Sequence, residues 1–194
     1  SYHYVPRFLN MIGGYLSPEG NYSSHQIDTA SQYTYGDKSY TFGSAPTEMA
    51  RSDLIVYFGN NPANTRMSGG SDTYHYQWYK KQNSARTIVI DPQYTDTACG
   101  REDLWLAIRP GSDAALVEAI AWVLITEGFT DDDFLKTHCY GYDEEPGDSE
   151  KNIPPLDKRL GYKAYILGEG IDGIAKTPKY ASAICGIPEE QIYQ

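Results

Sequence analysis

The stretch DLIVYFGNNPANT, residues 53–65, decides the fold because an apolar run changes abruptly into amide side chains around a proline. Its first half is the near-continuous apolar run expected of a buried strand covered on both faces. Two similar runs follow, RTIVID at 86–91 and LWLAI at 104–108. A helical pattern over 70–82 separates the first run from the second. This alternation predicts a parallel sheet with right-handed crossovers.

A helix is predicted after the third strand, in RPGSDAALVEAIAWVLITEG at 109–128. Ser112 stands where a capping side chain is expected, and Gly128 is a typical helix end. Asp113 falls in the first turn, where a carboxylate favours the positive end of the helix dipole. Other helices are expected over 5–16, from Thr130 onward, and at two proline starts, Thr177-Pro178 and Ile187-Pro188.

Two segments lack a periodic pattern. Residues 17–46 are rich in Ser, Tyr, Gly and Asn, which predicts a long functional loop or a pair of irregular turns. Residues 141–161 contain the run DEEPGDSE and predict a solvated acidic loop. The expected fold class is therefore α/β: an open, mainly parallel sheet with helices on both faces, of the dinucleotide-binding kind, plus irregular N-terminal and acidic loop segments.

Composition excludes several classes of function. A net charge of -10 disfavours sequence-independent binding to the phosphate backbone of nucleic acid. Backbone amides and helix N-termini can still hold a single nucleotide. The three cysteines and four histidines show no metal-binding spacing, so no metal ligand is predicted. The longest apolar run, 114–125, is too short to span a bilayer, and no targeting signal opens the chain.

Polar turns follow all three predicted strands: GNNPANT, DPQYTDTA and RPGSD. Because the carboxyl ends of parallel strands meet at one edge of a sheet, these turns are expected to line one crevice. In the first turn Pro62 fixes the backbone, and the candidate donors to phosphate oxygens are Asn60, Asn61, Asn64 and Thr65. The alternative for this turn is a purely structural surface turn.

The other two turns each offer a carboxylate. Asp91 directly follows a buried strand, where a carboxylate can accept hydrogen bonds from ribose hydroxyls. Asp113 can accept two hydrogen bonds, from N1–H and from the exocyclic amine of guanine. The alternatives are a helix cap or turn aspartate at Asp91 and an ordinary first-turn aspartate at Asp113.

Sequence signatures of catalysis are missing from the chain. It has no GxGxxG fingerprint, no P-loop, and no Ser/His/Asp or Cys/His order. The acids at 143–150 lack an apolar wall that would raise a carboxyl pKa. We therefore predict no catalytic residue, and expect the chain to hold a ligand that supplies the chemistry itself.

Four segments together resemble the molybdopterin-binding catalytic subunits of the dimethyl sulfoxide reductase family. In chain order they are GNYSSHQI, SDLIVYFGNNPANTRMSGG, IDPQYTDTACGREDLWLAIRPGSDAALVEAIAWVLITEG and KTPKYASAICGIPEEQI. The resemblance implies an internal fragment of a molybdenum oxidoreductase that reduces S-oxides or N-oxides by oxygen-atom transfer. The alternative is a freestanding nucleotide-binding or interaction module without redox activity.

The resemblance also implies a cofactor and its site. The cofactor is bis(molybdopterin guanine dinucleotide), with one guanosine end in this chain. Three groups of residues match the family's contacts: Asn60, Asn61, Pro62, Asn64 and Thr65 on the phosphate and pterin side; Asp91, Pro92 and Thr95 on ribose and guanosine; and Arg109, Gly111 and Asp113 on guanine. Gln93 stands where relatives usually carry arginine, so no charged contact is expected there.

The remaining expectations concern the whole enzyme. Residues 1–50 are expected to belong to an adjoining cofactor domain, 51–140 to form the nucleotide-binding core, and 141–194 to form the acidic loop and a helical segment. The molybdenum ligand and the cysteines of a 4Fe-4S cluster find no match in this chain, so the isolated chain is expected to be inactive. The resemblance implies an iron–sulfur electron-transfer subunit, a membrane anchor subunit, anaerobic respiration and a periplasmic location. It leaves open which oxide is reduced.

Overall fold

The computed structural model describes residues 3–17, 20, 22–36, 46–64, 78, 81–82, 84–150 and 152–194. Its contacts divide the chain into two units, Ser1–Ala45 and Pro46–Gln194. The first unit contains the helices α1 (Tyr4–Met11) and α2 (His25–Thr34). Helix α1 confirms the N-terminal helix and ends before Gly13 and Gly14, both at positive φ. Helix α2 lies in the segment predicted to be irregular, so that prediction is wrong for His25–Thr34. The backbone forms helical hydrogen bonds there although the sequence shows no apolar stripe.

The second unit is built on a parallel sheet of three strands in the order β1-β2-β3. The strands are β1 (Leu54–Phe58), β2 (Arg86–Ile90) and β3 (Leu104–Leu106), and a 3-10 helix, η1 (Pro46–Arg51), precedes them. Val56 lies opposite Ile88, and Ile88 lies opposite Leu104. The predicted fold class is confirmed. The helix predicted over 70–82 lies largely outside the described residues, although Trp78 within it is helical.

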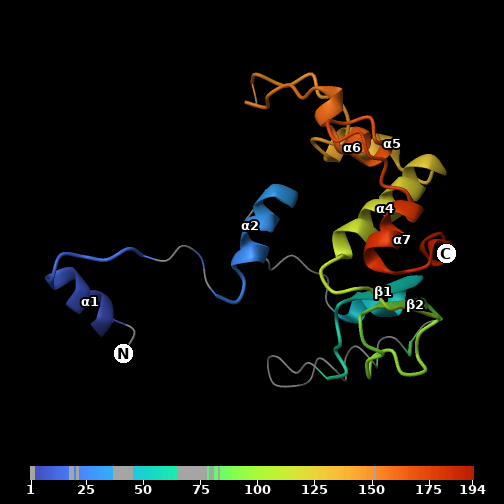
Figure 1. The fold of residues 1–194 in the computed structure, drawn as a ribbon, viewed down its shortest axis with the longest axis horizontal. Coiled ribbons are helices and arrows are strands. Elements are labelled where there is room, and N and C mark those ends of the chain that lie inside the picture. Colours follow the sequence, from blue (N-terminus) through green and yellow to red (C-terminus); the bar gives the residue numbers. More distant parts are fainter. Residues whose placement is uncertain are drawn as a thin grey trace. The chain divides into compact units, whose positions relative to one another are not determined.

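One face of the sheet packs against three helices: α4 (Asp113–Thr126), α7 (Pro178–Cys185) and α8 (Glu189–Ile192). Figure 1 shows α4 and α7 side by side next to the strands. The core between them consists of Ile90, Leu106, Ile108, Ala115, Leu116, Ala119, Ala181, Cys185, Ile187 and Ile192. The opposite face buries a smaller cluster of Ile55, Tyr57, Val89 and Ala98.

Contrary to the prediction, strand β1 is not covered on both faces. Its residues alternate between exposed and buried, and the side chains of Leu54, Val56 and Phe58 are 52%, 46% and 37% exposed. The physical reason is its place at the edge of the described sheet: the α4 and α7 core is centred on β2 and β3. An apolar groove therefore runs along this side of β1.

The helix starts follow the sequence signals only in part. The Thr177 hydroxyl accepts from the Tyr180 N–H at 3.1 Å and so caps α7. Ser112 occupies the N-cap position of α4, but its hydroxyl donates to the Arg109 carbonyl at 2.6 Å and caps nothing. At α5 (Asp132–His138) the cap is Asp131, one residue beyond the predicted start at Thr130.

The acidic segment is more ordered than a solvated loop. Two antiparallel bridges, Glu145 with Leu156 and Asp148 with Ile153, fold it back on itself. It leads into a 3-10 helix, η3 (Lys158–Leu160), and then into α6 (Tyr162–Leu167), which the sequence pattern did not predict. Among the described residues, none of the helices is both long and apolar enough to cross a membrane.

Candidate functional site

The candidate residues lie in three loops that leave the carboxyl ends of β1, β2 and β3. We call them the strand-end loops and define them as residues 59–64, 91–99 and 109–113. The backbone ties the strand ends together, since Gly59 N–H donates to the Ile90 carbonyl at 2.9 Å and Asp91 N–H donates to the Leu106 carbonyl at 3.2 Å. Because the strands are parallel, the three loops share one edge of the sheet, as predicted.

The first loop presents amide side chains outward. Asn60 and Asn64 are exposed, and no described residue forms a hydrogen bond with either side-chain amide. A bond of 3.1 Å from Asn64 N–H to the Asn61 carbonyl closes the turn around the buried Pro62. Thr65, the fifth candidate in this stretch, lies outside the described residues.

Thr97 connects the first loop to the second and was not among the predicted site residues. Its hydroxyl donates to Asn61 Oδ1 at 2.6 Å and accepts from Ala63 N–H at 3.1 Å. Thr97 is only 1% exposed. No local pattern identifies it, because its partner Asn61 is 36 residues away in the sequence. The two loops therefore form one hydrogen-bonded unit.

The second loop places Asp91 in a tight turn. Asp91 Oδ1 accepts from the Gln93 N–H at 2.9 Å, and its carbonyl accepts from Trp105 Nε1 at 3.0 Å. Pro92 is exposed. Thr95 is 9% exposed, and its hydroxyl accepts from the Ala98 N–H at 3.3 Å. Thr95 thus shapes the loop from inside, while Asp91 stays partly accessible.

The third loop brings Gly111 and Asp113 to the start of α4. Gly111 has a φ of 79°, which favours glycine, and an added Cβ would meet no atom within 4 Å. Asp113 is exposed, and no described residue forms a hydrogen bond or an ion pair with its carboxylate. Since Ser112 does not cap α4, the first N–H groups of the helix also have no side-chain acceptor among the described residues.

Arg109 has a structural role that the sequence did not predict. Its Nη1 donates to the carbonyls of Ala183 and Ile184, at 3.0 and 3.1 Å, near the C-terminal end of α7. Its backbone N–H donates to the Cys185 carbonyl at 2.9 Å. A cation at this end of a helix is also favoured by the helix dipole. Arg109 therefore fastens the third loop to α7 while its side chain remains exposed.

A tyrosine and a glutamate stabilise the far side of the second loop. The Tyr94 hydroxyl donates to Glu102 Oε1 at 2.6 Å and accepts from the Gly100 N–H at 3.0 Å. The bond to Glu102 raises the pKa of Tyr94 above its ordinary value. The pKa of Glu102 is lowered: its desolvation acts in the opposite direction, but hydrogen bonds from Tyr94 and backbone N–H groups outweigh it.

The strand-end loops have the chemistry of a nucleotide site. Side-chain amides and unused helix N–H groups donate to phosphate, and a free carboxylate accepts from a base. Within the described residues, no group of three or more His, Cys, Asp or Glu side chains is arranged to hold a metal ion. The outward amides of Asn60 and Asn64 and the exposed carboxylate of Asp113 therefore suit the binding of a ligand.

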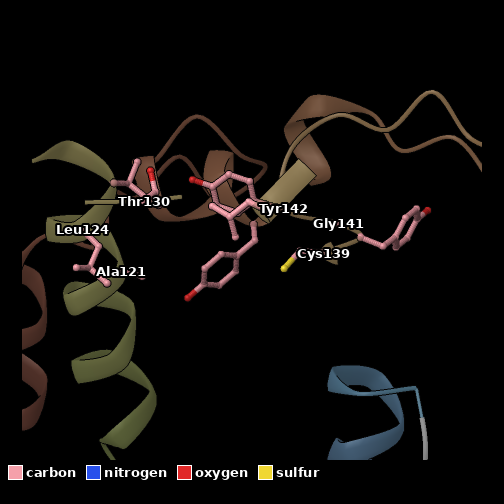
Figure 2. A pocket seen from close by; sticks show the side chains of 10 residues that line it. Ala121, Leu124, Thr130, Cys139, Gly141 and Tyr142 are labelled. Atoms are coloured by element: carbon pink, nitrogen blue, oxygen red, sulfur yellow. The ribbon is translucent and has the colours of Figure 1, made fainter. Parts of the chain in front are cut away.

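A separate cavity of about 310 Å³ lies between α4, α5 and the segment 139–142. Figure 2 shows Ala121 and Leu124 on its α4 side, with Tyr142 pointing toward Thr130. Burial raises the pKa of Tyr142. The lining has no charged side chain and includes no strand-end residue. This cavity is therefore unsuited to a phosphate group.

The chain is similar to proteins of one family. The molybdopterin oxidoreductase family matches residues 1–187. Dimethyl sulfoxide reductase DmsA of Escherichia coli (strain K12) is 51% identical over 97% of this chain and 22% of its own length. DmsA of Haemophilus influenzae is 51% identical over 97% of this chain and 23% of its own length. Trimethylamine-N-oxide reductase of H. influenzae is 28% identical over 98% of this chain and 22% of its own length.

Among solved structures, acetylene hydratase from Pelobacter acetylenicus has a similar fold. It aligns with a TM-score of 0.59 at 22% identity, over 87% of this chain and 18% of that chain. At this identity the likeness concerns the fold alone. The chain spans about a fifth of the length of the curated relatives that it matches.

Proposed function

Since the chain belongs to the molybdopterin oxidoreductase family, we propose that its strand-end loops bind one guanosine end of a bis(molybdopterin guanine dinucleotide) cofactor. Family membership implies a molybdenum–pterin cofactor, and the guanine dinucleotide form is the proposed refinement. The observation that supports it best is Asp113, whose exposed carboxylate has no hydrogen-bond or ion-pair partner among the described residues and lies at the uncapped start of α4. A carboxylate in this state is free to pair with N1–H and the exocyclic amine of guanine.

Each strand-end loop has its own part of the proposed ligand. We assign contacts with the phosphate and pterin side to the stretch of Asn60, Asn61, Pro62, Asn64 and Thr65. We assign contacts with ribose and guanosine to the loop of Asp91, Pro92 and Thr95, and contacts with guanine to the loop of Arg109, Gly111 and Asp113. The outward amides of Asn60 and Asn64 suit the first role. The partly accessible carboxylate of Asp91 suits the second. For Arg109, the contacts to α7 favour a role in holding the loop in place.

For the whole protein we propose reduction of S-oxides or N-oxides. The molybdenum–pterin group, when bound, supplies the two-electron oxygen-atom transfer. The residues of this chain bind and orient the nucleotide end of that group by hydrogen bonds, and none of them transfers a proton or an oxygen atom. The similarity to dimethyl sulfoxide and trimethylamine-N-oxide reductases supports this proposal. The freestanding-module alternative gains no support from a family match over 187 residues.

The proposal extends to the surroundings of the whole protein. A 4Fe-4S cluster, an iron–sulfur electron-transfer subunit and a membrane anchor subunit would deliver electrons in anaerobic respiration on the periplasmic side. Residues 1–50 would belong to an adjoining cofactor domain. In support of this, α1 exposes Phe8 and Met11 by 61% and 79%, which is apolar surface that a neighbouring domain can cover.

The activity is tested on the product of the complete gene with a reduced viologen as electron donor. We expect it to reduce dimethyl sulfoxide or trimethylamine-N-oxide. The 194-residue chain alone is expected to reduce neither, because it corresponds to only 22% of the length of the reductase DmsA that it matches. Reduction of either oxide by the isolated chain, or of neither oxide by the cofactor-loaded complete protein, would contradict the proposal.

A further inference from the structure

The side-chain amide of Asn61 is held in one orientation by a buried hydroxyl. Thr97 Oγ1 lies 2.6 Å from Asn61 Oδ1 and 3.1 Å from the Ala63 nitrogen. The Ala63 N–H can only donate, so the hydroxyl accepts there and its single proton is left for another acceptor. No described residue other than Asn61 accepts that proton.

This arrangement decides which end of the Asn61 amide points outward. If the amide were rotated by 180°, its NH₂ group would face the hydroxyl, and the proton of Thr97 would lose its acceptor at a position that is 1% exposed. A buried polar hydrogen without an acceptor is costly. The oxygen of Asn61 therefore faces Thr97, and its NH₂ group faces the outside of the turn.

We infer that Thr97 is a positioning residue: it holds Asn61 so that Nδ2 donates to an acceptor in the ligand, namely a phosphate oxygen of the diphosphate. This inference rests on the proposed function. Among the described residues of the site, Asn61 is the asparagine whose amide is fixed by another side chain. A preoriented donor binds an acceptor without losing further rotamer freedom. It also disfavours a ligand that presents a donor at this position.

The test compares Thr97→Val with Thr97→Ser in the 194-residue chain. Valine keeps the shape of threonine and removes the hydroxyl, whereas serine keeps the hydroxyl. GDP and guanosine are titrated, and affinities are measured by calorimetry or NMR. We expect Thr97→Val to weaken GDP binding about tenfold and guanosine binding by less than about twofold, because only GDP carries the diphosphate. Thr97→Ser is expected to bind both as the wild type does.

A second measurement needs no ligand. In the wild type the two Nδ2 protons of Asn61 should have chemical shifts displaced from those of a free asparagine amide, and in Thr97→Val these shifts should move toward the free values. Unchanged amide signals in Thr97→Val overturn the inference. So does a GDP affinity equal to that of the wild type, and so does an equal loss for GDP and guanosine, which would indicate general damage to the site.

The proposed function and the role of Thr97 can be contradicted separately. If wild-type chain binds GDP and Thr97→Val binds it equally well, the proposed function stands and the role of Thr97 is wrong. If the wild type binds neither GDP nor guanosine, the proposed function is contradicted, and with it the role of Asn61 toward a diphosphate. A melting temperature for each variant shows whether the fold is retained.

Discussion

In the helical layer formed by α4, α6 and α7, polar side chains bond to one another. In the strand-end loops, by contrast, several polar side chains are exposed and bond to no described residue. Lys176 is the centre of the helical layer. It is 2% exposed, it forms an ion pair with Asp172, and its Nζ lies 4.3 Å from the ring centre of Tyr165. Asp113 at the sheet edge is the opposite case, because its carboxylate is exposed and bonds to no described residue.

The polar groups of the helical layer stabilise the fold, whereas those of the strand-end loops are available to bind a ligand. In the helical layer, Tyr165 of α6 donates to Glu118 of α4 at 2.7 Å, and Lys176 lies 5.3 Å from the ring centre of Tyr180 on α7. These bonds hold three helices together. The outward polar groups of the strand-end loops form few bonds within the described chain, so they contribute little to the stability of the fold. Substitutions in the two regions should therefore differ in kind: loss of stability in the first and loss of binding in the second.

The largest effect on stability is expected from Lys176→Ala. This change removes a buried stem, a cation–π contact and an ion pair, so we expect the free energy of unfolding to fall by about 3 kcal/mol. Lys176→Met is the matched control, because it keeps the apolar volume and removes only the charge. It should cost less than the alanine variant. Urea unfolding measures both, and a loss below about 0.5 kcal/mol for Lys176→Ala would contradict the structural role.

A pair of glycines tests the same contrast in the backbone. Gly168 ends α6 at a φ of 78°, and an added Cβ would lie 2.5 Å from the Ala175 nitrogen. Gly59 begins the first strand-end loop at a φ of 58°, and an added Cβ there would meet nothing within 4 Å. We expect Gly168→Ala to lose more than about 2 kcal/mol and Gly59→Ala about 1 kcal/mol, since only the first adds a clash to the backbone strain. Equal losses in thermal unfolding would argue against the contrast.

A smaller effect is expected from Tyr165→Phe, which removes the hydrogen bond to Glu118. The loss should be about 1 kcal/mol near neutral pH. That hydrogen bond and burial raise the pKa of Tyr165 above its ordinary value. Because the folded pKa is the higher one, this stabilisation is complete below the unfolded pKa of about 10 and is lost as the pH rises beyond it. Unfolding measured from pH 8 to 11 should therefore show a steeper loss in the wild type than in Tyr165→Phe, and parallel curves would contradict this.

The sheet and several helices could be predicted from the sequence because their signals are local. The strands are short apolar runs, and Thr177-Pro178 marks the start of α7 through a cap and a proline only one residue apart. Helix α2 was missed because it has few apolar residues to show a period. The exposure of β1 was missed because an apolar run does not reveal that a strand lies at an edge.

The candidate site was predictable in its position and less so in its internal bonds. Polar residues after each strand indicate a shared edge, and the parallel sheet brings them there. The bonds of Arg109 to α7 join residues more than 70 positions apart. Burial of Lys176 depends on Tyr165 and Tyr180, which belong to two different helices. Such contacts are set by tertiary packing and leave no periodic pattern in the chain.

The most direct test is a titration of the 194-residue chain with GDP and ADP, comparing the wild type with Asp113→Ala. Adenine lacks the N1–H donor that pairs with a carboxylate, so it serves as the matched control ligand. The wild type should prefer GDP, and Asp113→Ala should lose about tenfold to a hundredfold in GDP affinity while binding ADP as before. Equal GDP binding by the wild type and Asp113→Ala would contradict the assignment of the strand-end loops as the guanine site.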